Sequence, residues 1–302
     1  MTVTTAYAQY DISYTNRVPY ITSDEYNNAP TAMDVSNLIP GGSAQANTTA
    51  LIETIGRASS WVDQYTMGSY GTLVATKNTE NARIWGSNNG SIVVHPKYWP
   101  ILEVSAFSVS SSPSAPAASV TPQGNIWIEP SQFIVQPGGV VGTGFGGLGF
   151  GRGQYYCSWQ YVNGWPNTSL SASVAAGAAS VSAVDPTGIY PGTGLELFDA
   201  PNDEMLVVAS DYVPGGTLLP LTHGLSYDHL AGTTLSNLPT AAKQAAISMV
   251  TCLVKIRGSG ALIVDDIGEA RRVAGAVGDG AIDDWEMAMR GIKALRQMYV
   301  GY

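Results

Sequence analysis

Apolar residues recur at helical spacing near both ends of the chain. Between positions 47 and 65 they return every three or four residues, which predicts an amphipathic helix. Its apolar stripe consists of Leu51, Ile52, Ile55, Ala58, Val62 and Tyr65. Asn47, Thr48 and Thr49 are candidates for the N-terminal cap, and Gly68 is a candidate stop.

Two more helices are predicted towards the end of the chain. The first begins at Pro239, because proline lacks only an N–H that a first helical turn leaves unused, and it stops at Gly258 and Gly260. Its stripe is Ala242, Ala246, Met249, Leu253 and Ile256. The last helix spans 281–299, with acidic residues in its first turns and basic ones later, as the helix dipole favours. Its stripe is Trp285, Ala288, Met289, Ile292, Leu295 and Tyr299. We expect the helices to bury one another in one small core.

Between these helices the apolar period changes towards two, which predicts strands. Short apolar runs at 83–85, 91–95, 101–105 and 125–129 are separated by turn residues, and Asn89-Gly90 suits a tight hairpin. The stretch 108–118 is predicted to be a loop, and 137–153 a glycine-rich loop. A second group of runs follows at 155–161, 171–174, 179–184, 194–198 and 204–209, with the even spacing of a small sandwich or barrel.

The pattern as a whole predicts an α+β fold, in which a small helical bundle from both ends of the chain carries a large inserted antiparallel β region. The expected parts are an extended N-terminal arm at 1–46, a bundle from 47–70 and 238–302, a β region at 71–165 and a small sandwich- or barrel-like insertion at 166–237. The tyrosine-rich, turn-rich arm is typical of a segment that orders against a neighbour. A short helical start, capped by Ser23, is expected before Pro30.

The charge is low in amount and uneven in distribution. Only 12% of residues are charged, and the net charge is −9. This argues against a phosphate-binding protein, because nucleic-acid affinity depends largely on lysine and arginine. Between Ser91 and Thr240 there are two basic residues and nine acidic ones. So few charges suggest a surface covered by other subunits; a polar surface rich in serine and threonine is the alternative, and composition does not separate the two.

The residues that usually carry chemistry give weak signals, so we expect no enzyme, no cofactor and no metal. Cys157 and Cys252 are too few for a thiolate metal site and are expected to be buried. The glycine loop matches G-x-G-x-x-G, but no helix follows it. His223 and His229, six residues apart, would need further ligands to bind a metal.

Acidic residues near tryptophans leave a sugar-binding or glycosidase alternative open. Glu129 lies close to Trp127, with Trp159 and Trp165 further on, although we expect these tryptophans to fill β cores. The N-terminus lacks the pattern of a signal peptide, and no run of 18 apolar residues occurs, so we expect folding in a cytoplasm and no membrane partner.

Three segments carry a resemblance to a known family. Residues 19–30 contain Tyr20, Thr22, Glu25-Tyr26 and Ala29-Pro30, and the front helix contains Ala58-Ser59 and Val62-Asp63-Gln64-Tyr65. The run from Leu238-Pro239 leads into a helix, and 175–184 is similar to β modules of phage structural proteins. Together they resemble head-to-tail adaptor proteins of long-tailed bacteriophages. The β insertion here is much larger than in the minimal helical adaptors.

The resemblance implies a role in the virion neck, after assembly in the host cytoplasm. Such adaptors form a ring, usually of twelve copies, between portal and tail, through which DNA passes without specific binding. A C-terminal segment docks on the portal, so Tyr299 and Tyr302 are candidate contacts. The glycine loop, with Phe145, Phe150 and Arg152, is either an exposed tip that meets a partner or an irregular connection. Glu196, Asp199, Asp203 and Glu204 are candidates for an acidic channel lining that lets DNA slide.

Two other functions stay open at this point. One is a different virion part, such as a tail terminator or a decoration protein. The other is a carbohydrate-binding or carbohydrate-active β protein.

Overall fold

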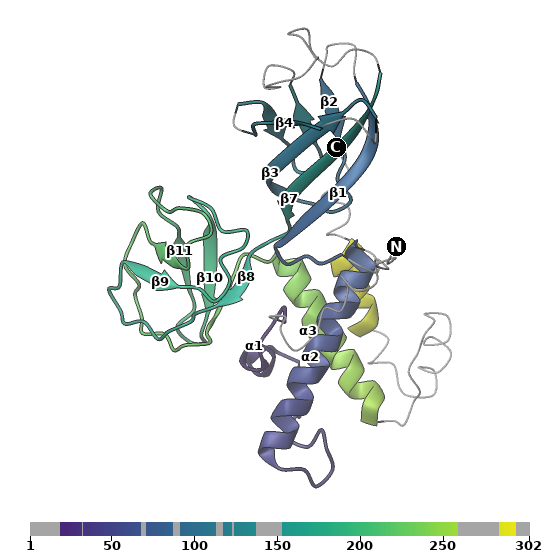
Figure 1. Ribbon diagram of the computed structural model, residues 1–302. Coiled ribbons are helices and arrows are strands. Elements are labelled where there is room, and N and C mark those ends of the chain that lie inside the picture. Colours follow the sequence, from purple (N-terminus) through teal and green to yellow (C-terminus); the bar gives the residue numbers. More distant parts are fainter. Residues whose placement is uncertain are drawn as a thin grey trace, which may run out of the picture. The chain divides into compact units, whose positions relative to one another are not determined.

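A computed structural model describes residues 19–31, 33–67, 71–86, 91–112, 117–122, 124–136, 153–258 and 284–293. The fold is α+β, as predicted: the N-terminal helices pack with C-terminal helices, and the central region is antiparallel β in four sheets (Figure 1). The chain divides into two compact units. One comprises Met1–Gly71, Asn167–Pro186 and Tyr190–Tyr302, and the other comprises Thr72–Pro166 with Thr187–Ile189.

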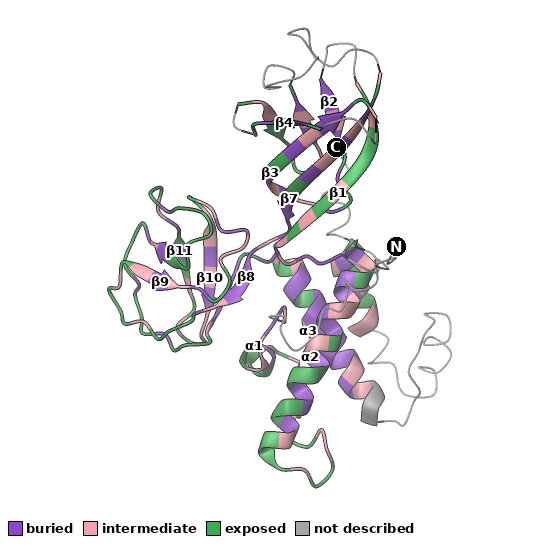
Figure 2. Cartoon of the chain, in the orientation of Figure 1, coloured by how far each residue is buried: buried purple, intermediate pink, exposed green. Residues whose placement is uncertain are grey.

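The helices of the first unit are α1 (Ser23–Asn28), α2 (Ala44–Met67), α3 (Thr240–Gly258) and a helix over residues 284–293. Most residues of the predicted stripes on α2 and α3 are buried (Figure 2): Leu51, Ile55, Ala58, Val62, Ala242, Ala246 and Met249. Tyr65 and Leu253 are half-buried, and the side chain of Ile256 lies outside the described part of the chain. Ile52 is an exception at 50% exposed, because one residue step of about 100° rotates it away from the stripe through Leu51 and Ile55. The indole of Trp285 packs edge-on against Trp61, with ring centroids 5.4 Å apart, and so joins the helix at 284–293 to α2.

Two helix caps differ from those predicted. α1 is capped by Thr22 instead of Ser23, because Thr22 and Glu25 form a reciprocal capping box. α2 begins earlier than expected, and the Ser43 hydroxyl accepts a hydrogen bond from the Ala46 N–H. Asn47 therefore lies inside the helix, where its buried side chain bonds the backbone of Ser36 and Ile39 and ties the preceding loop to α2.

The segment 19–28, expected to belong to an extended arm, packs on the helices of its own chain. Tyr20, Ile21 and Tyr26 are each 1% exposed. The Tyr20 N–H donates to the Ser59 hydroxyl on α2 at 3.1 Å, and the Tyr26 hydroxyl pairs with that of Thr251 on α3 at 3.1 Å. Residues 1–18 of the predicted arm lie outside the described residues.

The second unit is a β structure built around one apolar core. Its strands are β1 (Thr76–Trp85), β2 (Ile92–Val94), β3 (Ile101–Ser110), β4 (Ala118–Val120), β5 (Ile126–Ile128), β6 (Phe133–Val135) and β7 (Gln154–Asn163). They form the sheets β1-β7-β3-β4 and β2-β6-β5. Phe133 lies between Phe107 and Trp159, edge-on to both, at 6.0 and 6.1 Å between ring centroids. Aromatic side chains from both sheets therefore fill the core.

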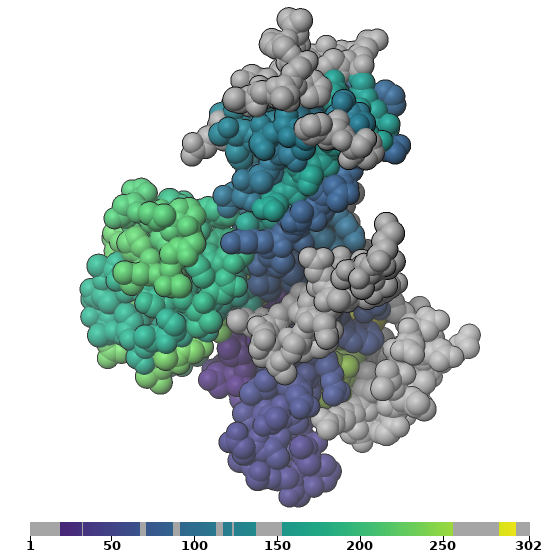
Figure 3. Space-filling model, viewed as in Figure 1, coloured from purple at the N-terminus to yellow at the C-terminus, as the bar shows by residue number. Residues whose placement is uncertain are grey.

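Within the first unit, residues 167–186 and 190–237 form a small antiparallel barrel. Its strands are β8 (Asn167–Ser169), β9 (Ser180–Ser182), β10 (Gly194–Phe198), β11 (Glu204–Val207), β12 (Leu218–Pro220) and β13 (Thr234–Ser236). The pairings β11-β10-β13-β8 and β12-β9 are joined by antiparallel bridges Val208–Leu221 and Leu170–Ala183, so the strands close a ring. Alternate leucines point inward and are buried, including Leu195, Leu197, Leu206, Leu219 and Leu235. In Figure 3 the barrel residues form one continuous lobe, coloured teal to light green.

Three local predictions in the β regions were wrong. The loop expected from Ser108 begins later, because Ser108 and Ser110 continue β3 by pairing with β7. Residues 171–174 form no regular strand, since Val174 leaves the barrel ladder to make an isolated bridge with His229. Trp127, expected in a core, is 66% exposed on β5, whereas Trp159 is buried as predicted.

Candidate functional site

The four acidic residues proposed as a channel lining gather around the β10–β11 hairpin of the barrel. Glu196 lies on β10, Glu204 begins β11, and Asp199 and Asp203 lie between the strands. The hairpin is narrowed by the Asp203 carboxylate, which accepts a hydrogen bond from the Asp199 N–H at 2.6 Å. One tight turn therefore brings four negative charges together.

His229 lies between two of these acids. Its Nδ1 is 3.0 Å from the Asp199 carboxylate, and its Nε2 is 2.7 Å from that of Glu204, with the imidazole fully buried. Glu204 also accepts hydrogen bonds from the backbone N–H groups of Ser226 and Tyr227. The acid pair therefore fastens the 226–229 loop to the hairpin.

The local environment favours the charged forms of His229 and Glu204. Burial lowers the pKa of His229, but hydrogen bonds and charge from Glu204 and Asp199 outweigh it and leave that pKa above its ordinary value. Burial raises the pKa of Glu204, but hydrogen bonds from Ser226, Tyr227 and His229 outweigh it and leave that pKa below its ordinary value. An imidazolium between two carboxylates is a structural ion cluster, because both ring nitrogens are occupied by acids.

Glu196 faces a second ionic contact, between the barrel and the helices of the same unit. The Lys243 ammonium on α3 is 2.5 Å from the Glu25 carboxylate of α1 and 2.9 Å from the centre of the Phe198 ring on β10. Burial lowers the pKa of Lys243 against the opposing effect of Glu25 and Glu196, and burial raises the pKa of Glu196. Lys243 therefore connects α3 to the α1 residue Glu25 and to strand β10 of the barrel.

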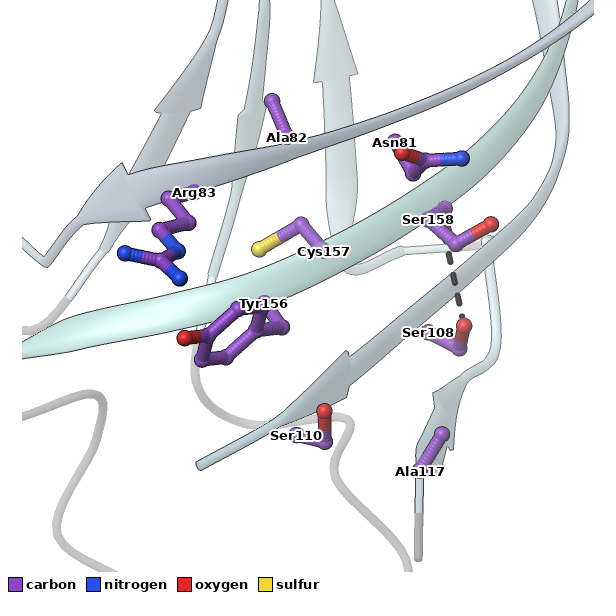
Figure 4. A pocket seen from close by; sticks show the side chains of 9 residues that line it. All are labelled: Asn81, Ala82, Arg83, Ser108, Ser110, Ala117, Tyr156, Cys157 and Ser158. Atoms are coloured by element: carbon purple, nitrogen blue, oxygen red, sulfur yellow. Dashed lines mark hydrogen bonds between the residues drawn. The ribbon is translucent and has the colours of Figure 1, made fainter. Parts of the chain in front are cut away.

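A shallow groove of about 430 Å³ lies on one face of the β1-β7-β3-β4 sheet (Figure 4). Two cross-strand rows line it: Arg83, Tyr156 and Ser110 in one, and Asn81, Ser158 and Ser108 in the other. The Arg83 guanidinium stacks on the Tyr156 ring at 4.8 Å from its centre. The groove therefore offers one positive charge on an aromatic platform, with hydroxyl and amide groups around it.

Five of the predicted partner-contact residues lie outside the described residues: Phe145, Phe150, Arg152, Tyr299 and Tyr302. Cys157 and Cys252 are buried free thiols, as expected, and burial raises their pKa to about 12 and about 11. Such thiols are poor nucleophiles at neutral pH.

The described residues contain neither a metal-binding cluster nor a membrane-spanning helix. No group of three or more histidine, cysteine or acidic residues there is arranged to hold a metal ion. Of the helices in those residues, none has the length and apolarity needed to cross a bilayer.

The contacts of His229 and of Arg83 were not predicted from the sequence. Asp199 and Glu204 were expected to face a channel, and nothing in the hairpin sequence links them to a histidine 25 residues beyond Glu204. The Arg83–Tyr156 contact depends on the register of β1 against β7, and no local pattern predicts this register because strands β2 to β6 lie between the two in the chain. No protein-family model matches the chain, and no curated protein matches it.

Proposed function

We propose that this chain is a structural virion protein, a head-to-tail adaptor that forms a ring between portal and tail through which DNA passes. On this proposal its role is not catalytic and needs no cofactor. The observation that carries it is that the residues behind the adaptor resemblance belong to one interlocked core. Tyr20 bonds both Ser59 and Asp63, while Thr22 and Glu25 cap the short helix that buries Tyr26 against α3. The resemblance therefore rests on residues that act together to fix the bundle.

The surface of the barrel also favours an assembled protein. Large apolar side chains stand exposed on it, with Met205 at 66%, Val213 at 76% and Leu230 at 73%. If these side chains lie together in the assembled protein, a neighbouring subunit that covers them would remove apolar surface from water. Low overall charge agrees with a surface partly covered by neighbouring subunits.

Immunogold labelling of purified virions tests the proposed location. An antibody against the barrel is expected to label particles at the neck, between capsid and tail. Label spread over the capsid would instead identify a decoration protein, and no label on virions would reject a structural role. A tail terminator would also lie near the neck, but would not bind isolated portal protein, whereas the adaptor binds it directly.

The exposed Trp127 favours one alternative, carbohydrate binding, because exposed aromatic faces can stack on sugar rings. Glu129 follows Trp127 by two residues in the sequence, and its carboxylate accepts a hydrogen bond from the Gln132 side chain at 2.5 Å. A glycan array with the wild type and Trp127→Ala tests this function. Binding that is lost in the variant would support it, and a blank array would reject it.

A further inference from the structure

The two β structures carry complementary charge. The barrel residues 167–237 contain seven acidic residues and neither lysine nor arginine. The second unit has four basic residues against three acidic ones over 72–166. Lys77 and Arg83 lie on β1, a sheet-end strand with mostly exposed side chains (Figure 2). Opposite charges on different parts of one chain suit a head-to-tail contact between copies.

Arg83 is the charged residue of the groove, which is the positively charged surface of the proposed contact. Within the described part of the chain it stacks on Tyr156 and has no ion-pair partner. The rest of the lining consists of the polar residues Asn81, Ser108, Ser110 and Ser158 and of Ala82, Ala117 and Cys157. A carboxylate with a small apolar neighbour fits this lining: the guanidinium takes the acid, and the tyrosine ring takes the apolar group.

The barrel supplies the negatively charged surface, and among its seven carboxylates Asp211 differs from the other six. Those six all interact with groups of their own chain, whereas Asp211 is exposed and has no such partner among the described residues. It lies in the turn 209–216, which is held rigid. The buried Tyr212 donates its hydroxyl to the Gly216 carbonyl at 2.7 Å, and the Gly216 N–H bonds the Val213 carbonyl at 3.1 Å.

The tip of this turn presents an acid and an apolar group together. Val213, two residues after Asp211, is 76% exposed. Gly215 has φ of 89°, a left-handed conformation that favours glycine and lets the chain reverse tightly. Because the turn is already fixed, it would lose little conformational entropy on docking.

We propose that the 209–216 turn of one copy docks in the Arg83 groove of a second copy, with Asp211 paired to Arg83 and Val213 against Tyr156. This interface rests on the proposed function, since it is one of the side-to-side contacts of the ring. The groove and the turn are different surfaces, so the contact is heterologous and repeats from copy to copy. Closure of such a repeat gives a ring.

A charge swap on the full-length protein tests the interface. Arg83→Glu and Asp211→Arg are each expected to weaken assembly by at least about tenfold, because each places like charges together. The double variant restores opposite charges and is expected to recover assembly. Exposed Arg57 and Glu53 on α2 supply matched controls, Arg57→Glu and Glu53→Arg. Light scattering and sedimentation, alone and with portal protein, measure the assembled fraction; unchanged melting temperatures show that the variants fold.

The outcomes separate the interface from the function. Rings in the wild type, loss in both single variants and recovery in the double variant support the contact. Wild-type rings with single variants that assemble normally, or with no recovery in the double variant, overturn the contact and leave the adaptor function standing. A wild type that stays monomeric even with portal overturns both.

Discussion

The hydroxyl of Tyr20 donates a hydrogen bond to the carboxylate of Asp63, which lies 43 residues further along the chain on α2. Both side chains are buried, at 1% and 4% exposed. A buried carboxylate needs donors, because burial removes its water. The pair therefore fixes where the entry segment docks on α2.

Tyr20→Phe is expected to destabilise the first unit by about 1.5–3 kcal/mol, the usual range for a lost hydrogen bond to a charged group. Urea unfolding followed by circular dichroism measures the free energy of unfolding. Tyr227→Phe, at a 46% exposed tyrosine, is the matched control and should change little. A loss no larger than that of the control would show that the Tyr20–Asp63 pair does not fix the entry segment.

The barrel should lose stability as the pH rises through the pKa of His229. That pKa lies above its ordinary 6.5, because Glu204 and Asp199 outweigh the effect of burial. The stabilisation by the imidazolium is therefore complete below about pH 6.5 and disappears as the pH passes the raised pKa. The pKa of Glu204 is lowered below 4.5, so its contribution is present above about pH 4.5 and fades in stronger acid.

Thermal melting between pH 5 and 9 measures this dependence. The melting temperature of the wild type should fall towards alkaline pH, and that of His229→Gln should fall less, because glutamine does not titrate. Equal slopes for the two proteins would contradict a charged His229. His229→Gln should also be less stable at pH 6, by roughly 3 kcal/mol, because it leaves two carboxylates facing each other.

The Lys243–Glu25 pair makes a prediction about which substitutions the unit tolerates. Lys243→Ala is expected to cost about 3–5 kcal/mol, because it leaves the Glu25 carboxylate buried without its cation. The double variant Lys243→Met, Glu25→Gln removes both charges and retains the side-chain volume, so it should be much closer to the wild type. Chemical denaturation of the three proteins decides it; a double variant as unstable as Lys243→Ala would show that the packing, and not the charge pair, dominates.

The acidic residues of the β10–β11 hairpin differ in exposure, so the DNA-channel hypothesis can be tested at one of them. Asp203 is exposed, whereas Glu204 and Asp199 hold His229. If the hairpin lines the channel, Asp203→Lys should slow DNA ejection or increase DNA retention in assembled particles, whereas Asp203→Asn, which keeps an oxygen acceptor for the Asp199 N–H, should have a smaller effect. Glu53→Lys on α2 is the control. Unchanged ejection in Asp203→Lys would count against an acidic lining at this hairpin.

The sequence predicted the fold class because helical and strand periods are local properties. The stripes through Leu51 and Ile55 on α2 and Ala242 and Ala246 on α3 need only the right spacing to reveal a buried face. Closure of the barrel was harder to predict, because it depends on isolated bridges at Val208 and Leu170 that have no local sequence signal.

The polar sites were beyond a reading of the sequence for the same reason. His229 meets Asp199 across 30 residues and Arg83 meets Tyr156 across a long connection, so each contact exists only after the strands have found their register. The cap of α2 was predicted wrongly for a different reason. Ser43 and Asn47 both have side chains that can cap a helix, and the packing of the preceding loop against Asn47 leaves Ser43 as the cap.

The mass of the purified protein, alone and mixed with its portal protein, shows whether it forms rings; light scattering combined with negative-stain imaging measures it. The adaptor account predicts rings, either of the protein alone or formed from monomers when portal is added. A protein that stays monomeric and does not bind portal would contradict it.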